Sequence, residues 1–374
     1  MSSSLRRPSS IQQERRRVVG QSAWPDLPPE LLERIVAVVG PRDRVAVRLV
    51  CASWRACVRE SFPSDLPFEA PRLLLRRPGI GGGLAFFSLH HRKVLPFAVP
   101  ASISSGRCCG HIAGWLAMAF DADRSMVLCN LISGQSVAVP PPPVFPVSKV
   151  VLSAPPTSPG WVAAALGRTG TMVLLQPAVS GGAWMTIGVD EAAQHGGFRD
   201  MAFWSGRLCA LGYDGAVLAF RGDLRARAAA VSLLREAEHP VGALTGGCWA
   251  LYLVGSDGEL LVVRKLYTVR LNSDAVELQV EVRALLSAGE RRWGLMEEMP
   301  GRAVFVGSVA SAVVAVGLYG GLRESCVYFA RREVEMLAPH AICEYSMAEE
   351  EMRGVPIAGG HSADVEPVWI TPVV

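Results

Sequence analysis

The sequence contains few charged residues and almost no lysine. Only 19% of the 374 residues are Asp, Glu, Lys or Arg, and the net charge is +3. Residues 1–22 alone carry a local charge of +4, so the remainder of the chain sums to −1. A nucleic-acid-binding protein needs a basic face, so this balance argues against such a function. Lysine occurs only at Lys93, Lys149 and Lys265 against 34 arginines, and the matching excess of Ala, Gly, Pro and Val indicates a compositional bias.

Paired cysteine motifs are also absent. The nine cysteines are scattered, odd in number, and never spaced as C-x-x-C. A secreted disulfide scaffold is shorter and denser in cysteine, so we expect reduced thiols in an intracellular protein. The first twenty residues lack the apolar run of a secretory signal. Their Arg- and Ser-rich, acid-poor composition also fits an organelle transit peptide, but we favour a disordered basic tail over 1–22 because a folded element follows at once.

Sequence motifs for catalysis are missing. The chain has no G-x-S-x-G elbow, H-E-x-x-H pair, P-loop or G-x-G-x-x-G turn. Cys108, Cys109 and His111 could act as soft metal ligands, but adjacent strand residues point to opposite faces, so we expect no metal site there. We predict no catalytic residues and no cofactor.

One segment is long enough to span a membrane. Residues 303–322 are twenty uncharged residues between Arg302 and Arg323. The segment is rich in valine, interrupted by four glycines and poor in Leu, Ile and Phe. These features favour a pair of buried strands, so we expect no membrane association.

Residues 24–60 have a helical pattern that the rest of the chain lacks. Asp26 is the predicted N-cap, and the Gly40–Pro41 pair ends the first helix. About forty residues of short helices bury little surface alone, so this module needs a partner or an attached domain. Its apolar residues form two stripes, Leu27, Leu31, Ile35 and Val38 in one and Val47, Val50 and Trp54 in the other.

After Pro63 the sequence becomes a series of short apolar runs separated by Gly, Pro, Asp and Ser, which is typical of antiparallel sheet. Three G-x-x-G turns, at 167–170, 212–215 and 255–258, each join two apolar runs and predict hairpins whose glycines supply positive φ. Their final glycines are 45 and 43 residues apart. This spacing matches the period of a four-stranded propeller blade.

The segment 64–374 is long enough for six or seven such blades. A large β-sandwich or barrel with chance hairpin similarity is the alternative. Bulky tryptophans recur among these strands, as expected where blades stack on one another: Trp161, Trp184, Trp204 and Trp249. The fold class is therefore α+β multidomain, with a small all-α module at 23–63 and an all-β, propeller-like domain at 64–374.

The helical module resembles an F-box. The resemblance rests on Leu27-Pro28-x-Glu30-Leu31-Leu32, Ile35 and Arg48-x-Val50-Cys51-x-x-Trp54-Arg55. It implies that the helices insert an apolar face into the Skp-type adaptor of a cullin-RING ubiquitin ligase, a helix-in-groove mode of binding. Arg44 departs from the family, where an apolar residue is usual. The implied adaptor contacts are Leu27, Pro28, Leu31, Ile35, Val50, Cys51 and Trp54.

The remaining domain resembles the plant F-box proteins with a C-terminal kelch-like propeller of unknown function, the KIB type. The tail at 347–363 fits that pattern poorly. The matching stretches follow the family's order: SSG (104–106), GH (110–111), GWL (114–116), NLISG (130–134), VPPP (139–142), KVVLS (149–153), FWSGRL (203–208), DG (214–215), YLV (252–254), GELL (258–261), RAVFVG (302–307) and CVYF (326–329).

The two resemblances together imply a non-catalytic substrate receptor of an SCF-type ligase. The adaptor and, through it, a cullin are the implied partners, with a target protein whose identity and binding residues the sequence does not give. The alternative is a scaffold protein whose F-box no longer engages the ligase. We expect it in the cytoplasm, the nucleus or both, in preference to an organelle.

Overall fold

The computed structural model of the protein divides by its internal contacts into two units, Met1–Leu66 and Pro67–Val374. The predicted tail at 1–22 lies outside the described residues, as do Asp26 and Arg44. The structure describes residues 27–39, 47, 50–51, 53–54, 56–57, 71–77, 83–89, 92–96, 101–131, 133–220, 231–233, 249–256, 258–269, 276–286, 293–316, 321–330, 341–357 and 367–370.

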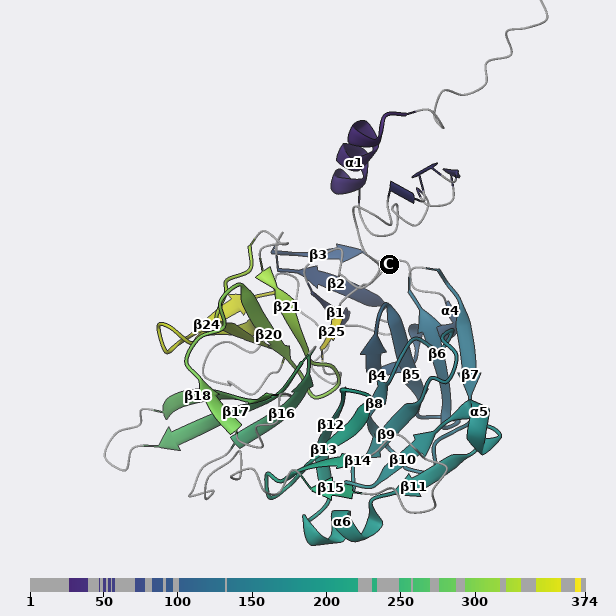
Figure 1. Ribbon diagram of the computed structural model, residues 1–374, viewed down its shortest axis with the longest axis vertical. Helices are drawn as coiled ribbons and strands as arrows, with labels where there is room; N and C mark the ends of the chain where they lie inside the picture. The colour runs from purple at the N-terminus through teal and green to yellow at the C-terminus, as the bar shows by residue number, and fades with distance from the viewer. Residues whose placement is uncertain are drawn as a thin grey trace, which may run out of the picture. The chain divides into compact units, whose positions relative to one another are not determined.

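The first unit contains helix α1, Pro29–Val38 (Figure 1). Pro28 takes the N-cap position that the sequence analysis gave to Asp26, and its carbonyl accepts hydrogen bonds from the N–H groups of Leu31 and Leu32 at 3.0 and 3.1 Å. Pro29 suits the first turn because it lacks the N–H that would be left without a partner there. The helix ends just before the predicted Gly40–Pro41 stop.

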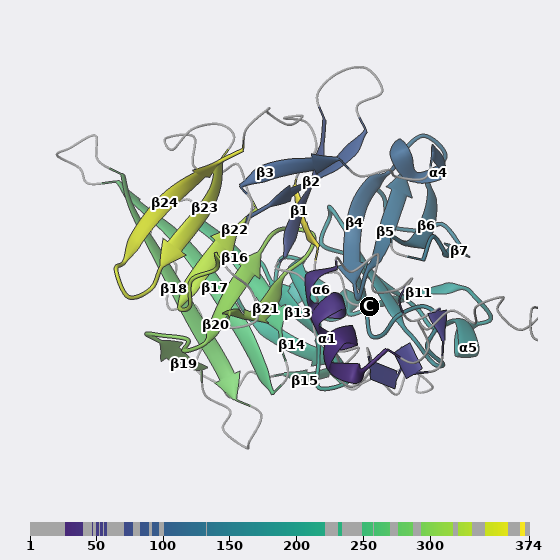
Figure 2. The same cartoon turned by 90° about the horizontal axis from the view of Figure 1, so that it is seen from above.

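Among the described residues, the second unit forms six sheets that follow one another around a ring, which we call blades 1 to 6 (Figures 1 and 2). Blade 1 is β25 (Val368–Ile370), β1 (Arg72–Arg76), β2 (Leu84–Ser88) and β3 (Lys93–Pro96); blade 2 is β4 (Arg107–Ile112), β5 (Trp115–Phe120), β6 (Ser125–Asn130) and β7 (Ser136–Val139); blade 3 is β8 (Val147–Leu152), β9 (Ala163–Gly167), β10 (Met172–Leu175) and β11 (Trp184–Ile187).

The other three blades follow in chain order, and short helices lie in three of the connections: α4 (Ala101–Ser104), α5 (Pro177–Ser180) and α6 (Val189–Gln194). Blade 4 is β12 (Phe198–Trp204), β13 (Arg207–Gly212), β14 (Val217–Phe220) and β15 (Val231–Leu233); blade 5 is β16 (Trp249–Gly255), β17 (Glu259–Val269), β18 (Val276–Leu286) and β19 (Trp293–Met296); blade 6 is β21 (Ala312–Ala315), β20 (Arg302–Val306), β22 (Cys326–Phe329), β23 (Ala341–Ser346) and β24 (Glu351–Pro356).

Six clusters of buried apolar side chains hold the ring together, one between each pair of neighbouring blades. Successive residues of a strand alternate between two clusters: in β13, Cys209 and Leu211 face blade 5, whereas Leu208 and Ala210 face blade 3. Outer strands such as β7 and β24 keep exposed residues, whereas inner strands such as β13 are buried on both faces. This burial explains why the runs in the sequence are apolar throughout and do not alternate with polar residues.

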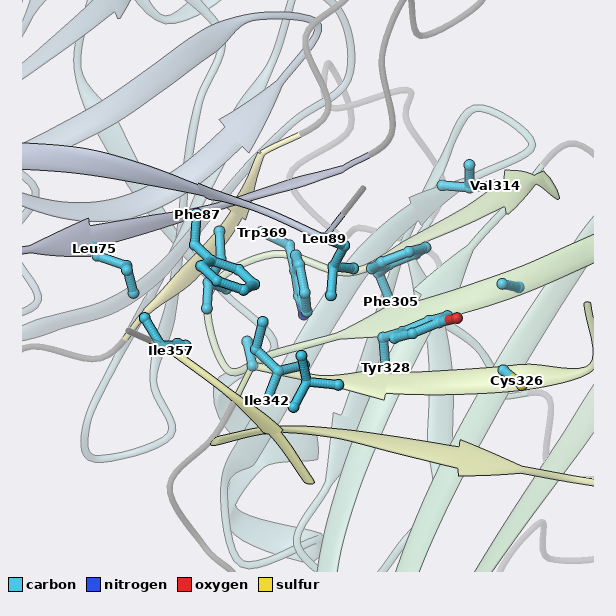
Figure 3. Close-up of a cluster of buried hydrophobic side chains, with 14 of the residues drawn as sticks. Leu75, Phe87, Leu89, Phe305, Val314, Cys326, Tyr328, Ile342, Ile357 and Trp369 are labelled. Carbon is cyan, nitrogen blue, oxygen red and sulfur yellow. The ribbon is translucent and has the colours of Figure 1, made fainter. Parts of the chain in front are cut away.

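The ring closes through the C-terminal strand. β25 pairs antiparallel with β1, so that blade 1 combines strands from both ends of the domain. Trp369 of β25 is 1% exposed and lies among Phe87, Leu89 and Phe305 in the cluster between blades 6 and 1 (Figure 3). Its indole N–H donates to the carbonyl of Val306 at 3.2 Å. One side chain thus joins the last blade to the first.

The three G-x-x-G turns are hairpins, as predicted, and the two glycines of each have different functions. The final ones, Gly170, Gly215 and Gly258, have φ between 79° and 88°, a region that favours glycine. At the first ones, other atoms lie within about 3 Å of where a Cβ would be. A Cβ on Gly255, for example, would lie 2.1 Å from the carbonyl oxygen of Phe203 on β12.

The spacing of these turns predicted four-stranded blades, but the third turn does not occupy the same position in its blade as the first two. The first two turns join the second and third strands of blades 3 and 4, whereas the third joins the first and second strands of blade 5. The 28 residues between β14 and β16 make the spacing of 43 residues coincide with a blade by chance. The described part of the chain forms six blades.

Residues 303–322 contain a pair of strands, as expected. β20 and β21 form an antiparallel hairpin in blade 6, and β20 also pairs in parallel with β22. This inserted hairpin gives blade 6 its fifth strand. Within the part of the chain that the structure describes, no helix has the length and apolar character needed to cross a bilayer.

Candidate functional site: an exposed apolar face on α1 and the polar sites of the propeller

Helix α1 presents an apolar face that its own unit does not cover. Leu31, Val38 and Val50 are 46%, 84% and 52% exposed, and Ile35, one turn after Leu31, is half-buried. The spacing of i, i+4 and i+7 places the three helix residues on one side of α1. We call Leu31, Ile35 and Val38 the exposed face, and Val50, outside α1, is a further exposed apolar residue of the same unit. Such a stripe is the pattern of a helix that packs into the groove of a partner.

The opposite side of α1 forms the small core of the unit. Leu32 and Val36 are buried there with Val47, Trp54 and Cys57, each at most 9% exposed. Trp54, predicted to contact the adaptor, therefore lies in this core, because its large ring is the main apolar volume available to cover α1. Trp54 can therefore support partner binding only indirectly, by packing against α1.

The other predicted contacts differ in their exposure. Pro28 is exposed, and Leu27 and Cys51 are half-buried, with their apolar atoms packed against the core. The Cys51 thiol lies 3.0 Å from the hydroxyl of Ser53. Val38, the most exposed apolar residue of the helix, was assigned to the stripe but not to the contacts. Its position seven residues after Leu31 was the signal that could have included it.

In the propeller, Cys108 and Cys109 do point to opposite faces of β4. Cys108 packs between blades 1 and 2, and Cys109 between blades 2 and 3. Burial raises the pKa of both thiols, that of Cys109 to about 12. Burial also lowers the pKa of His111 to about 3, and its Nε2 accepts a hydrogen bond from the N–H of Gly114. Among the described residues, no group of three potential ligands could hold a metal ion.

The buried His195 pairs with Asp214, whose side chain is 44% exposed, and no sequence pattern indicated this contact. Their Nδ1 and Oδ2 atoms lie 2.6 Å apart, and His195 is 3% exposed. In a catalytic arrangement, the other nitrogen of such a histidine contacts a nucleophile. Nε2 of His195 is buried and has no hydrogen-bond partner among the described atoms. The pair therefore connects the end of α6 to the β13–β14 turn and does not form a reactive centre.

The innermost strands carry an ion pair that is sealed from water. Lys149 on β8 and Asp200 on β12 are 3% exposed, and their Nζ and Oδ1 atoms are 2.6 Å apart. Asp200 also accepts the backbone N–H groups of Met201 and Leu253. Because both side chains are buried and Asp200 accepts three hydrogen bonds, the pair is a structural link between blades.

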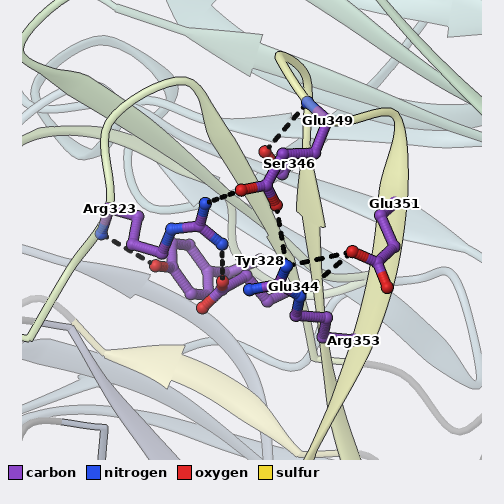
Figure 4. Close-up of polar contacts among 7 residues, drawn as sticks. All are labelled: Arg323, Tyr328, Glu344, Ser346, Glu349, Glu351 and Arg353. Carbon is purple, nitrogen blue, oxygen red and sulfur yellow. Dashed lines mark hydrogen bonds and ion pairs between the residues drawn. The ribbon is translucent and has the colours of Figure 1, made fainter.

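A surface network of charges braces the β23–β24 turn of blade 6 (Figure 4). Arg323 contacts Glu344 at 3.2 Å and Glu349 at 2.8 Å, and Arg353 contacts both Glu349 and Glu351 at 3.0 Å. The hydrogen bond from Arg323 holds the pKa of Glu349 below its ordinary value. Because all of these contacts are satisfied within one blade, the network orders the turn.

A groove of about 730 Å³ lies between blades 5 and 6, within the size range of ligand pockets. Its lining includes no histidine or cysteine, so it has neither a common nucleophile nor a common metal ligand of those types. Its carboxylates could accept cationic groups. The main apolar and acidic side chains are Met296, Tyr345, Met347, Glu281, Glu297 and Glu350.

Comparisons with known proteins agree with this architecture. A family model described as KIB1-4 beta-propeller matches residues 86–350, and a model described as F-box-like matches residues 24–62. No curated protein matches the chain.

Several solved structures are similar to the chain at low identity. One from a nidogen/laminin complex is 10% identical over 80% of this chain and 96% of that chain, with a TM-score of 0.43. The N-terminal domain of Nup159 is 11% identical over 82% and 83%, with a TM-score of 0.36. Streptogramin B lyase is 11% identical over 74% and 79%, with the same TM-score. These similarities are too distant to bear on function.

The KIB1-4 model covers more than half of the sequence, and the six blades of the second unit agree with it. No enzyme family is indicated, and F-box domains in general bind Skp adaptors. The chain therefore belongs to the KIB1-4 β-propeller family, with an F-box-like domain preceding the propeller.

Proposed function

We propose that the protein is the substrate-recognition subunit of an SCF-type cullin-RING ubiquitin ligase. The F-box-like unit binds a Skp-type adaptor and, through it, the cullin, and the propeller binds a target protein. No residue of the chain is catalytic in this proposal, and no cofactor is needed. Tethering acts by raising the effective concentration of target lysines near the charged ubiquitin-conjugating enzyme.

The exposed face of α1 is the observation that carries the proposal. Leu31, Val38 and Val50 lie on the surface, whereas other apolar side chains form the buried core of the same unit. Removing these side chains from water against a partner groove would supply the binding free energy, at about 25 cal/mol per Å² of apolar surface. Leu27, Pro28, Ile35 and Cys51 would complete the contact around them.

Co-purification with a Skp-type adaptor tests this proposal. We expect the wild-type chain to bind, and the double variant Leu31→Asp, Val50→Asp to lose about 100-fold or more in affinity, because it would bury two unpaired charges in the interface. Val189→Asp is the matched control, since Val189 is an aliphatic residue of the propeller that is 61% exposed. Circular dichroism checks that all three chains are folded.

A folded wild-type chain that does not bind the adaptor would contradict the proposal. The second candidate, a scaffold protein with an F-box that does not engage the ligase, would then take its place. Arg44, where an apolar residue is usual in the resemblance described above, is the feature that favours this candidate. Arg44→Leu restoring adaptor binding would support it.

We further propose that the protein acts in the cytoplasm, the nucleus or both, where cullin-RING ligases work. A fluorescent fusion at the C-terminal end tests this location. Import into an organelle with removal of the Arg- and Ser-rich segment at 1–22 would contradict it.

A further inference from the structure

Each of the three lysines of the sequence lies in a described strand, and the structure gives them different environments. Lys93 is on β3, Lys149 on β8 and Lys265 on β17. Lysine amines accept ubiquitin, whereas the guanidinium groups of the 34 arginines remain protonated and do not. The accessibility of these three amines therefore decides where a lysine of this protein could be modified.

Lys149 cannot present its amine to another protein while the propeller is folded. Its side chain is 4% exposed, and Nζ donates to Asp200 at 2.6 Å on the neighbouring innermost strand. Withdrawing the amine would leave Asp200 as a buried, unpaired charge, which is strongly unfavourable.

Lys265 is enclosed still more completely. The residue is 0% exposed, and its Nζ lies 4.8 Å from the centroid of the Phe329 ring, across the interface between blades 5 and 6. A cation over an aromatic face is stabilised by the ring quadrupole, so the contact helps to keep the amine inside. Exposing it requires separation of the two blades.

Lys93 alone of the three is exposed. It starts β3, the edge strand of blade 1, where its register partner on β2 is Ser88. No ion pair or hydrogen bond of its amine is recorded among the described residues. A charged side chain on an edge strand also discourages pairing with other chains. Arginine would serve that purpose equally well, and the chain uses arginine almost everywhere else.

We propose that Lys93 is the self-ubiquitination site of this protein. The inference rests on the proposed function, because the adaptor must bring the chain to the ligase. The neutral Lys93 amine attacks the thioester carbonyl that links ubiquitin to the cysteine of the conjugating enzyme. A C–N amide bond forms, the C–S bond breaks, and the released thiolate takes up the proton that the amine loses. Self-modification is thereby confined to a single lysine on blade 1.

The test uses the full chain in a reconstituted ligase with adaptor, cullin-RING subunits, conjugating enzyme and ubiquitin, without a target. Lys93→Arg keeps the charge and removes the acceptor. We expect at least a tenfold loss of ubiquitinated chain, with adaptor co-purification and thermal stability unchanged. Lys149→Arg, which keeps a cation beside Asp200, is the control and is expected to be modified like the wild type. Mass spectrometry of the ubiquitin remnant identifies the modified residue.

Modification of Lys93→Arg to the wild-type extent, or a remnant on Lys149, Lys265 or the α-amino group in the folded wild type, would overturn the assignment while leaving the proposed function intact. A wild-type chain that binds the adaptor but is not modified would do the same. Failure to bind the adaptor would instead overturn the proposed function. An amine-reactive acetylating probe gives an independent readout, and we expect Lys93 to react at least tenfold faster than Lys149 and Lys265 unless the chain is first denatured.

Discussion

Lys149 Nζ lies 2.6 Å from Asp200 Oδ1, and this pair joins the innermost strands of two blades. The second carboxylate oxygen of Asp200 accepts the N–H of Leu253 on β16 at 2.7 Å. One carboxylate thus ties β8, β12 and β16 together. Because the pair is sealed from solvent, each charge depends on the other.

Replacing Asp200 by alanine is therefore expected to destabilise the propeller by about 3–5 kcal/mol, since it leaves the Lys149 charge and two backbone N–H groups without acceptors. Urea denaturation measures the change. The matched control is Asp121→Ala, which breaks an ion pair with Arg107. The Asp121 side chain is 53% exposed and that of Arg107 is 29% exposed. An exposed pair of this kind contributes at most about 1 kcal/mol. Equal losses in both variants would contradict the structural function of Asp200.

Gly255 illustrates how closely the inner strands approach one another. An added Cβ would lie 2.1 Å from the Phe203 carbonyl oxygen, a backbone atom that cannot move aside without shifting β12. We expect Gly255→Ala to cost about 1–3 kcal/mol in the free energy of unfolding. Gly294→Ala on β19 has open space around its Cβ and should be neutral or slightly stabilising. Thermal melting distinguishes them, and a neutral Gly255→Ala would disprove the contact.

In the F-box-like unit, Trp54 lies in the core and Leu31 lies on the surface. Trp54→Ala removes a side chain that is 7% exposed and should cost about 3–5 kcal/mol in a unit that is small to begin with. Any loss of adaptor binding should then accompany loss of helical circular dichroism. Leu31→Asp should lose binding with its helical signal intact. The interpretation fails if Trp54→Ala abolishes binding but remains fully folded.

Buried thiols make the stability of the propeller depend on alkaline pH. Burial raises the pKa of Cys109 and of Cys209 to about 12, above the ordinary value near 9. Between these values the unfolded chain has lost protons that the folded chain keeps, so stability is full below about pH 9 and falls as the pH rises towards 12. The slope is about 1.4 kcal/mol per pH unit for each thiol.

Denaturation midpoints measured from pH 7 to pH 10.5 give this slope. The double variant Cys109→Ala, Cys209→Ala is less stable at pH 7 because it leaves cavities, but its alkaline slope should be flatter than that of the wild type. The comparison concerns slopes, which the cavities do not affect. Identical slopes would show that these thiols are already accessible in the folded chain.

Local signals in the sequence predicted the elements of both units. The Leu27–Pro28 start and the pattern through Trp54 indicated the F-box-like unit, and G-x-x-G turns indicated hairpins, because positive φ at Gly170, Gly215 and Gly258 is a property of the local backbone. Whether the three turns occupy the same position in their blades was not predictable in this way. Which strand of a blade a hairpin supplies depends on neighbours that are distant in sequence.

Spacing along α1 indicated which of its two adjacent leucines faces outward: Leu31, a stripe residue, is 46% exposed, and Leu32, outside the stripe, is 2% exposed. The second stripe was not resolved in this way. Trp54 and Val50 belong to the same predicted apolar stripe. Packing nevertheless places Trp54 in the core and Val50 on the surface. A side chain's exposure depends on which residues the fold sets opposite to it, and periodicity alone does not contain that information.

Local patterns were enough to indicate which residues turn, which strands are apolar on both faces, and which helix carries an apolar stripe, because these depend on backbone preferences and on spacing along one element. The six described blades, the closure of blade 1 by Trp369 and its strand, and the burial of Lys149 and Lys265 but not of Lys93 became evident from the folded chain. Those features arise from contacts between residues far apart in the chain, where close packing selects one arrangement out of many that the local signals allow.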